Sequence, residues 1–227
     1  MSIKKIAMKF ALAAAVMGVG VASASATTID TTPYWNGSST LGTFGGSSST
    51  STYGETFSAP GGALNDFTFY VNTFGQSIAA TAQVYAWSGA FNGHGPATGS
   101  ALFSQAVTLN SSSLQAYTFN TGGLALNAGS SYVALITVTN TSQAGNAVWG
   151  FLSSNPGVAN DGNVVWFNNN GNISLLTSSA WDGPWINGSL AWTADFAAVP
   201  EPASLALLGV GLAGLCASRR KKKPAQA

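Results

Sequence analysis

Short stretches in which apolar and polar residues alternate dominate the middle of the chain. Phe67, Phe69 and Val71 fall on one side of an extended segment, and the residues between them fall on the other. A period of two is typical of a β-strand with one face in the core. The run 132–139 is more evenly apolar, which is expected for a central strand.

Seven further segments have strand character and are separated by clusters of Gly, Ser, Thr and Asn. They are Thr52–Ser58, Ile78–Ser88, Ala101–Leu109, Gln115–Asn120, Ala147–Leu152, Val164–Asn168 and Leu190–Ala197. Between the two ends of the chain, no window shows the sustained helical period. The sequence therefore predicts an all-β fold, an antiparallel β-sandwich that is jelly-roll-like, with an immunoglobulin-like sandwich as the alternative. The Ser-, Thr- and Gly-rich segment 36–52 is predicted to be a flexible loop or arm.

The N-terminus has the three parts of a secretory signal peptide. Three Lys residues within the first nine positions precede an apolar stretch, residues 10–21, and a series of small residues that ends at Ala26. Ala24 and Ala26 satisfy the A-x-A rule, so cleavage is predicted after Ala26. We expect a signal helix within residues 1–26 and a mature protein that begins near Thr27. The alternative is an uncleaved transmembrane helix.

The C-terminus ends in a polar motif, an apolar run and a basic cluster. These are Pro200, Glu201 and Pro202, then residues 203–218, then Arg219, Arg220, Lys221, Lys222 and Lys223. As a helix the apolar run would be roughly 24 Å long, shorter than the ~30 Å hydrocarbon core, which predicts a weak or transient transmembrane helix. The basic cluster marks the cytoplasmic side, so the body of the chain is expected on the opposite side.

This tail resembles that of the PEP-CTERM proteins, which are exosortase substrates in Gram-negative bacteria that make extracellular polysaccharide. The resemblance implies that exosortase, an integral membrane protease or transpeptidase, cuts near the Pro-Glu-Pro motif. The precursor would sit in the inner membrane, and the body would then pass to the cell surface or extracellular matrix. The expected organisation is a signal peptide at 1–26, an exported domain at 27–198 and a sorting tail at 199–227.

The exported domain resembles the "choice-of-anchor" modules, so called because closely similar bodies carry different C-terminal sorting tails. The resemblance rests on residues 52–57, 67–70, 84–87, 97–103 and 119–124. Such modules have no agreed activity, so the resemblance implies no functional residues.

All eight Lys and Arg residues lie in the two termini, so the exported domain contains none. Its charged residues give a formal net charge of −6 and are Asp30, Glu55, Asp66, Asp161, Asp182 and Asp195. A domain without a cation cannot neutralise phosphates, which excludes nucleic acid as a partner. The lone Cys, Cys216, lies in the apolar tail, so the domain is predicted to have neither a disulfide nor a thiolate metal site.

Candidate catalytic groups are sparse. His94, the only histidine, lies between two glycines and is predicted to be an exposed turn residue rather than a general base. Glu55 and an Asp could form the carboxyl pair of a glycoside hydrolase, but no spacing identifies the partner. The six acids are therefore interpreted as surface or turn residues. We expect no enzymatic activity; a glycoside hydrolase or lyase is the less favoured alternative.

Two loops are candidates for binding. Trp181 and Trp185 flank a loop that contains Asp182, so indole faces could stack on a sugar while polar atoms bind its hydroxyls. Alternatively, these Trp residues pin the loop to the sandwich. Asp161 and Asn163 offer oxygens for a structural Ca²⁺, although an Asp-Gly turn is the simpler interpretation.

Together, these features predict a non-enzymatic surface or matrix protein that is associated with exopolysaccharide and has no cofactor. A carbohydrate-binding module is the alternative.

Overall fold

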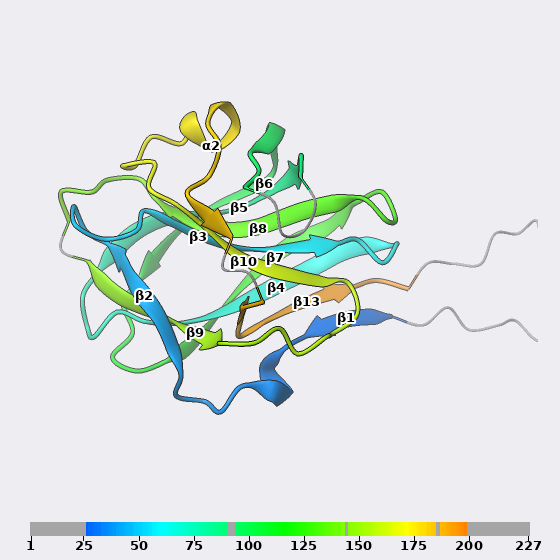
Figure 1. The fold of residues 1–227 in the computed structure, drawn as a ribbon, viewed down its shortest axis with the longest axis horizontal. Helices are drawn as coiled ribbons and strands as arrows, with labels where there is room; N and C mark the ends of the chain where they lie inside the picture. The colour runs from blue at the N-terminus through cyan, green and yellow to red at the C-terminus, as the bar shows by residue number, and fades with distance from the viewer. Residues whose placement is uncertain (1–25, 90–93, 144, 185–186, 199–227) are drawn as a thin grey trace, which may run out of the picture. The chain divides into compact units, whose positions relative to one another are not determined.

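Two antiparallel β-sheets make up most of the described part of the chain (Figure 1). The computed structural model describes residues 26–89, 94–143, 145–184 and 187–198, which belong to one compact unit, Ala26–Ala198. The predicted signal helix and the predicted transmembrane helix at 203–218 lie outside these residues. No helix among the described residues is long and apolar enough to cross a membrane.

The first sheet has the strand order β1-β13-β4-β9-β12, with β7 also paired to β4 and β2 to β9. Its strands are β1 (Thr27–Asp30), β2 (Thr40–Gly45), β4 (Ala63–Asn72), β7 (Gln115–Ala125), β9 (Asn146–Leu152), β12 (Ser189–Leu190) and β13 (Trp192–Phe196). Every pairing in this sheet is antiparallel.

The second sheet has the order β11-β10-β3-β8-β5-β6. Its strands are β3 (Thr52–Ser58), β5 (Ile78–Trp87), β6 (Ala97–Leu109), β8 (Ser131–Val138), β10 (Asp161–Phe167) and β11 (Gly183–Pro184). Among the described residues the helices are short: the 3₁₀ turn η1 (Thr32–Tyr34) and α2 (Leu175–Ser178).

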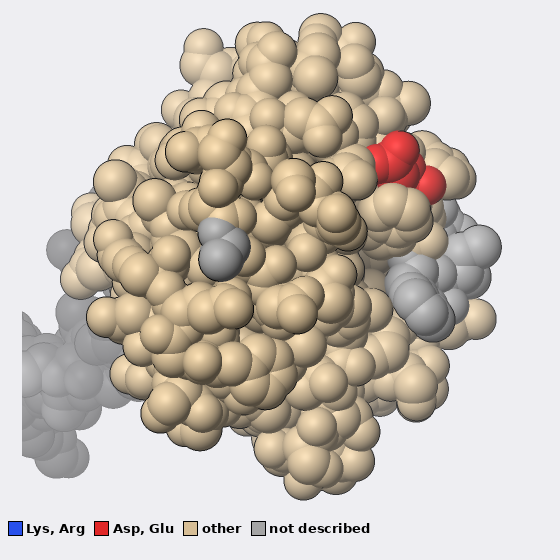
Figure 2. Space-filling view, turned by 90° about the vertical axis from the view of Figure 1, so that its left-hand side faces the viewer, with Lys and Arg blue, Asp and Glu red and all other residues tan. Residues whose placement is uncertain are grey.

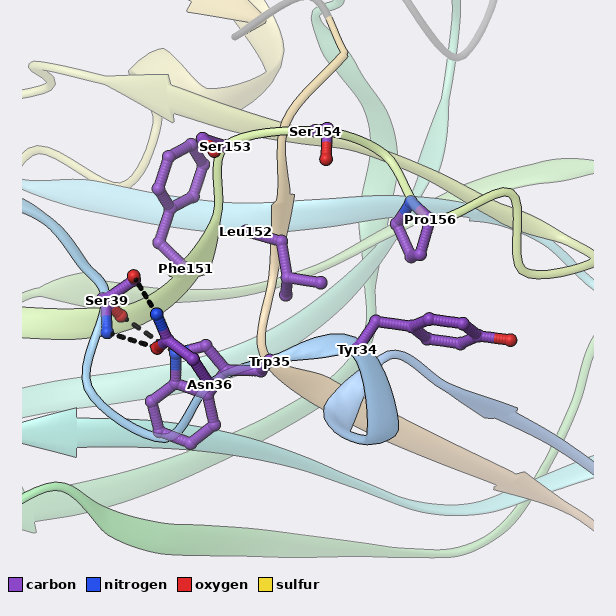
Figure 3. Close-up of a pocket in the computed structure, with 9 residues that line it drawn as sticks. All are labelled: Tyr34, Trp35, Asn36, Ser39, Phe151, Leu152, Ser153, Ser154 and Pro156. Atoms are coloured by element: carbon purple, nitrogen blue, oxygen red, sulfur yellow. Dashed lines mark hydrogen bonds between the residues drawn. The ribbon is translucent and has the colours of Figure 1, made fainter.

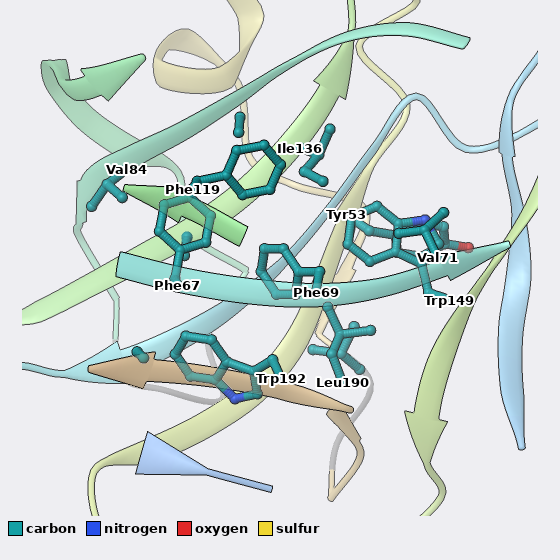
Figure 4. Packing of buried hydrophobic residues seen from close by; sticks show 14 of the residues in the cluster. Tyr53, Phe67, Phe69, Val71, Val84, Phe119, Ile136, Trp149, Leu190 and Trp192 are labelled. Carbon is teal, nitrogen blue, oxygen red and sulfur yellow. The ribbon is translucent and has the colours of Figure 1, made fainter. Parts of the chain in front are cut away.

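The main core lies between the two sheets and is rich in aromatic rings (Figure 4). Tyr53 of β3 packs against Trp149 of β9 with ring centroids 5.6 Å apart, and Phe57 of β3 packs against Trp192 of β13 at 5.7 Å. Each pair joins one sheet to the other, as expected where two inner faces interdigitate. The predicted all-β antiparallel sandwich agrees with this arrangement.

A second cluster covers the outer face of the second sheet. It contains Val133 and Leu135 of the central strand β8, together with Leu176 of α2 and Trp181. Because β8 lies between β3 and β5 and is covered on both faces, both sides of its sequence are apolar. This explains the evenly apolar run that predicts a central strand. Both clusters lie within Ala26–Ala198, so this unit has the cores that independent folding requires.

The prediction that residues 36–52 form a flexible loop or arm is wrong for residues 40–45 and for Thr52, which starts β3. Strand β2 occupies Thr40–Gly45 and pairs with β9, where Leu41 lies opposite Trp149 and Phe44 opposite Ala147. The register shifts between Leu41 and Phe44, so both side chains are buried although they are three positions apart. That spacing hides the strand from a search for a period of two.

Candidate functional site

The predicted glycan loop does not present Trp181 to solvent. This residue is 2% exposed, and its indole lies edge-on to Trp87 at 5.2 Å and stacks on Phe167 at 5.8 Å. Its Nε1 donates to the Leu176 carbonyl oxygen over 2.9 Å. Trp181 therefore pins its loop to the second sheet and has no open face for a sugar ring.

The rest of that loop provides one exposed acceptor. Asp182 is exposed, and its Oδ2 accepts a hydrogen bond from the Asn168 backbone N–H over 2.7 Å. Trp185 lies outside the described residues. His94, which is exposed as expected, also contacts this region, since its Nδ1 is 3.1 Å from the Trp181 carbonyl oxygen.

The two Ca²⁺ candidates have other partners. Asp161 Oδ1 accepts from Trp192 Nε1 over 2.8 Å. Asn163 is 8% exposed, its backbone carbonyl oxygen accepts from Thr56 Oγ1 over 3.2 Å, and its backbone N–H donates to the same hydroxyl over 3.0 Å. Among the described residues, no group of three or more His, Cys, Asp or Glu side chains is placed to hold a metal ion.

Glu55 and Asp161 form a carboxyl pair. The interpretation of all six acids as surface or turn residues is wrong for Glu55, whereas Asp161 is half-buried and follows a turn, in which its N–H donates to the Val158 carbonyl oxygen over 3.2 Å. Glu55 is fully buried, and its Oε2 accepts from the Leu190 backbone N–H over 2.8 Å. Glu55 Oε1 and Asp161 Oδ2 are buried without a hydrogen-bond partner. Alternation in β3 gives the signal for this placement, because Glu55 lies between the core residues Tyr53 and Phe57.

Burial changes the acidity of both carboxyl groups. Removal from water, and then the charge of Asp161, raises the pKa of Glu55 well above its ordinary value of 4.5. Removal from water also raises the pKa of Asp161 to about 6, although hydrogen bonds from Trp192, Ser189 and Gly162 oppose that shift. The pair lines neither of the clefts described next.

A cleft of about 310 Å³ opens between the turn after η1 and the end of β9 (Figure 3). Its lining residues combine aromatic rings with amides and hydroxyls: Tyr34, Trp35, Asn36, Ser39, Phe151, Leu152, Ser153, Ser154 and Pro156. Tyr34 is 63% exposed, so the cleft has an open aromatic ring at its side. We call it the aromatic cleft.

Hydrogen bonds fix one wall of the aromatic cleft. Asn36 Oδ1 accepts from the backbone N–H groups of Ser38 and Ser39 over 2.9 and 2.8 Å, and Asn36 Nδ2 donates to Ser39 Oγ over 2.7 Å. This Asx turn is a local arrangement that Asn favours. The Trp35 ring packs against Tyr70 at 5.3 Å, which holds the turn against β4.

The two walls meet at a single carbonyl oxygen. Trp35 Nε1 and the Phe151 backbone N–H both donate to the Ser39 carbonyl oxygen, over 2.9 and 3.0 Å. On the far wall, Asn155 Nδ2 donates to the Gly162 carbonyl oxygen over 2.6 Å. The cleft is therefore largely preformed, which lowers the entropy cost of binding.

A second, more apolar cleft of about 460 Å³ shares Phe151 with the aromatic cleft. Its other lining residues are Thr40, Leu41, Gly42, Thr50, Tyr53 and Trp166. Among the described residues that line either cleft, none is charged. Figure 2 shows a face of the domain on which charge is nearly absent. Aromatic rings beside amides and hydroxyls suit a neutral sugar, with its apolar ring face and its hydroxyl groups.

Sequence reasoning missed this site. The adjacent aromatics Tyr34 and Trp35 in a turn region are a weak local signal, but their partner Phe151 lies more than a hundred positions away. The topology that brings β2 beside β9 has no counterpart in the local pattern.

Comparison with known proteins gives one decisive observation, at the end of the chain. Residues 198–221 match the PEP-CTERM protein-sorting motif. The PEP-CTERM match includes Pro200, Glu201 and Pro202, and it confirms the resemblance of the tail. It implies a membrane-anchored precursor that an exosortase recognises and sorts for export to the cell surface. The choice-of-anchor resemblance of the body stays a prediction. No curated protein and no solved structure matches the chain.

Proposed function

We propose that the chain is a non-enzymatic protein of the cell surface or extracellular matrix that binds extracellular polysaccharide through the aromatic cleft and needs no cofactor. The PEP-CTERM match supports the location, because it implies export and sorting by an exosortase. A protein delivered outside a polysaccharide-producing cell meets that polysaccharide at high density.

The observation that carries the binding proposal is the exposed Tyr34 ring in a preformed, uncharged cleft. Asn36, Ser153 and Ser154 place an amide and hydroxyls around it. The cleft volume of about 310 Å³ is at the lower end of the ~300–1,000 Å³ range that is usual for ligand pockets. This size fits one or two sugar units, and the second cleft beyond Phe151 would lengthen the path for a chain.

The position of the carboxyl pair supports a non-enzymatic role. A glycoside hydrolase needs two carboxyl groups that flank the scissile bond of its substrate. Glu55 is fully buried, and neither Glu55 nor Asp161 lines a described cleft. The pair is better suited to holding β3, β10 and β12 together.

We further propose a jelly-roll topology, which the strand pairs support better than the immunoglobulin-like alternative. The pairs β3–β10, β4–β9 and β5–β8 are nested, with β6 and β7 consecutive at the centre. Such nesting results when a long hairpin is rolled into two sheets. A choice-of-anchor module with this topology would place the aromatic cleft at the β2–β9 side of the sandwich.

Substitution at Tyr34 tests the binding proposal. Binding of the domain, residues 26–198, to exopolysaccharide from a producing bacterium would be measured by pull-down and calorimetry. We expect Tyr34→Ala to weaken binding by about tenfold, because loss of one stacking ring costs on the order of 1 kcal/mol. Tyr34→Phe keeps the ring and should retain most of the affinity.

Phe74→Ala is the matched control. Phe74 is 59% exposed and lines neither cleft, so its loss should leave binding unchanged. Equal binding by the wild type and Tyr34→Ala would remove the aromatic cleft as the site. A loss of binding in Asp182→Asn, with Tyr34→Ala unaffected, would instead place the site at the loop that contains the exposed Asp182.

A further inference from the structure

Strand β6 is an open edge of the second sheet. Residues 103–109 pair with residues 78–84 of β5 on one side. On the other side, β6 is the last strand of its sheet in the described part of the chain. Backbone N–H and C=O groups along this side are therefore available to another strand.

This edge lacks the usual features that block strand addition. Proteins commonly protect an exposed edge with charged residues, with Pro or with a bulge. No residue from Ala97 to Ala125 is charged or is Pro. The register of β6 shifts between Thr98, which pairs with Ala86, and Phe103, which pairs with Val84. From Phe103 to Leu109 the pairing with β5 is continuous. Seven regular residues are long enough for an ordinary strand pair.

The sequence of this edge is compatible with a second copy of itself. In an antiparallel pair related by a two-fold axis at Ala106, Ala106 faces its own copy and Ser104 faces Thr108. On the inner face, Phe103 would lie opposite Leu109, and both pack against or within the main core. Small side chains thus meet on the outer face. On the inner face Phe103 meets Leu109, and Gln105 lies opposite Val107.

We propose that two copies of the exported domain associate through antiparallel pairing of their β6 edges, centred on Ala106. The result is one continuous sheet across both copies. A second copy is the favoured occupant because the edge is self-complementary and uncharged, whereas the acids that would repel an identical domain lie on other elements. This surface is separate from both clefts, so the proposal does not depend on polysaccharide binding.

Lysine at the two-fold position provides the test. Sedimentation equilibrium of residues 26–198 over a wide concentration range should show a reversible dimer for the wild type. Ala106→Lys places two cations opposite each other and should weaken association by about tenfold or more. Ser112→Lys adds the same charge at an exposed position after β6, and its dimer should persist.

A charge swap checks the register. Ala106→Glu alone should also be monomeric, whereas an equimolar mixture of Ala106→Lys and Ala106→Glu should form a heterodimer. Directly opposite residues have Cβ atoms about 4.5–5.5 Å apart, so Ala106→Cys should form an intermolecular disulfide under mild oxidation while Ser112→Cys should not.

Two results would overturn the proposal, provided that circular dichroism shows folded variants. One is a wild-type domain that stays monomeric at every concentration. The other is a dimer that Ala106→Lys leaves intact and Thr118→Lys on the β7 edge dissociates. Either result leaves the binding test at Tyr34 unaffected.

Discussion

At the scale of single residues, the least ordinary feature is a pair of acids in a domain that has no Lys or Arg. Glu55 is fully buried in a domain without Lys or Arg, and Asp161 is its charged neighbour. A buried carboxylate without a counter-ion is costly, so uptake of a proton is the remaining way to neutralise it. Hydrogen bonds from the Leu190 N–H to Glu55 and from Trp192 Nε1 to Asp161 help to orient the two groups.

This pair should make the domain more stable in mild acid than at neutral pH. Burial raises the folded-state pKa of both carboxyl groups, so the folded state binds more protons than the unfolded state above pH ~4. The stability that Asp161 contributes should therefore be lost as pH rises from 3.8 to about 6. The stability that Glu55 contributes should be lost over a pH range that starts at 4.5 and extends well above it. The loss is expected to be on the order of 1–3 kcal/mol. Urea unfolding between pH 4 and pH 8, in steps, measures it.

Glu55→Gln is the control for that pH dependence. Its amide has nearly the same shape, can still accept from the Leu190 N–H and does not titrate. The variant should show a flatter dependence of stability on pH, as should Asp161→Asn. Stability of the wild type that increases with pH across this range would contradict the assignment.

At the scale of elements, β-strand periodicity predicted most of the second sheet but not the strands without clear alternation. Thr52–Ser58 coincides with β3, and Ile78–Ser88 exceeds β5 by one residue. The missed strands are β1, β2 and β11, which are short or irregular. In β2 the bulge and the Ser- and Thr-rich surroundings remove the signal, and only its pairing with β9 makes it a strand.

The same limit applies to the candidate site. From sequence alone, the Trp-Asp-Gly-Pro-Trp loop allows either rings that stack on a sugar or rings that pin the loop to the sandwich. Trp181 follows the second alternative, because it lies in the second core cluster. Which aromatic ring is exposed depends on whether a face of the sheet is covered. That coverage is a tertiary property, so local sequence cannot decide between Trp181 and Tyr34.

Truncation of Phe44 tests whether β2 is an integral part of the sandwich. Phe44 is fully buried and packs edge-on against Trp149 at 5.4 Å. Phe44→Ala should cost about 3–5 kcal/mol of unfolding free energy, as is usual for a buried Phe. Ser47→Ala, at an exposed neighbouring position, should change stability by less than about 0.5 kcal/mol. Equal stability of the two variants in urea unfolding would show that residues 40–45 are a loosely attached arm and no integral part of the sandwich.

At the scale of the whole molecule, a folded domain without cations is joined to a tail that carries the sorting signal. The PEP-CTERM match begins at residue 198, two residues after β13 ends at Phe196. Little chain therefore separates the last strand from Pro200, and an exosortase that cuts near the motif would leave the sandwich intact.

Replacement of Pro200, Glu201 and Pro202 together by Ala should abolish processing. The full-length precursor would then accumulate in the membrane fraction of an exosortase-positive host, and mass spectrometry of the surface fraction would lack the mature form. Pro224→Ala, beyond the matched residues, should be processed normally. Release of the triple variant at the wild-type rate would show that another signal directs sorting.

The pairing of β1 with β13 has a consequence for the order of folding. Thr27 lies opposite Phe196, so the first strand of the exported domain is held by the last. During passage through a translocation channel from the N-terminus onward, β1 has no neighbour until the whole domain has emerged. Closure of the first sheet at this edge therefore has to wait for Trp192–Phe196, the last strand before the matched sorting motif.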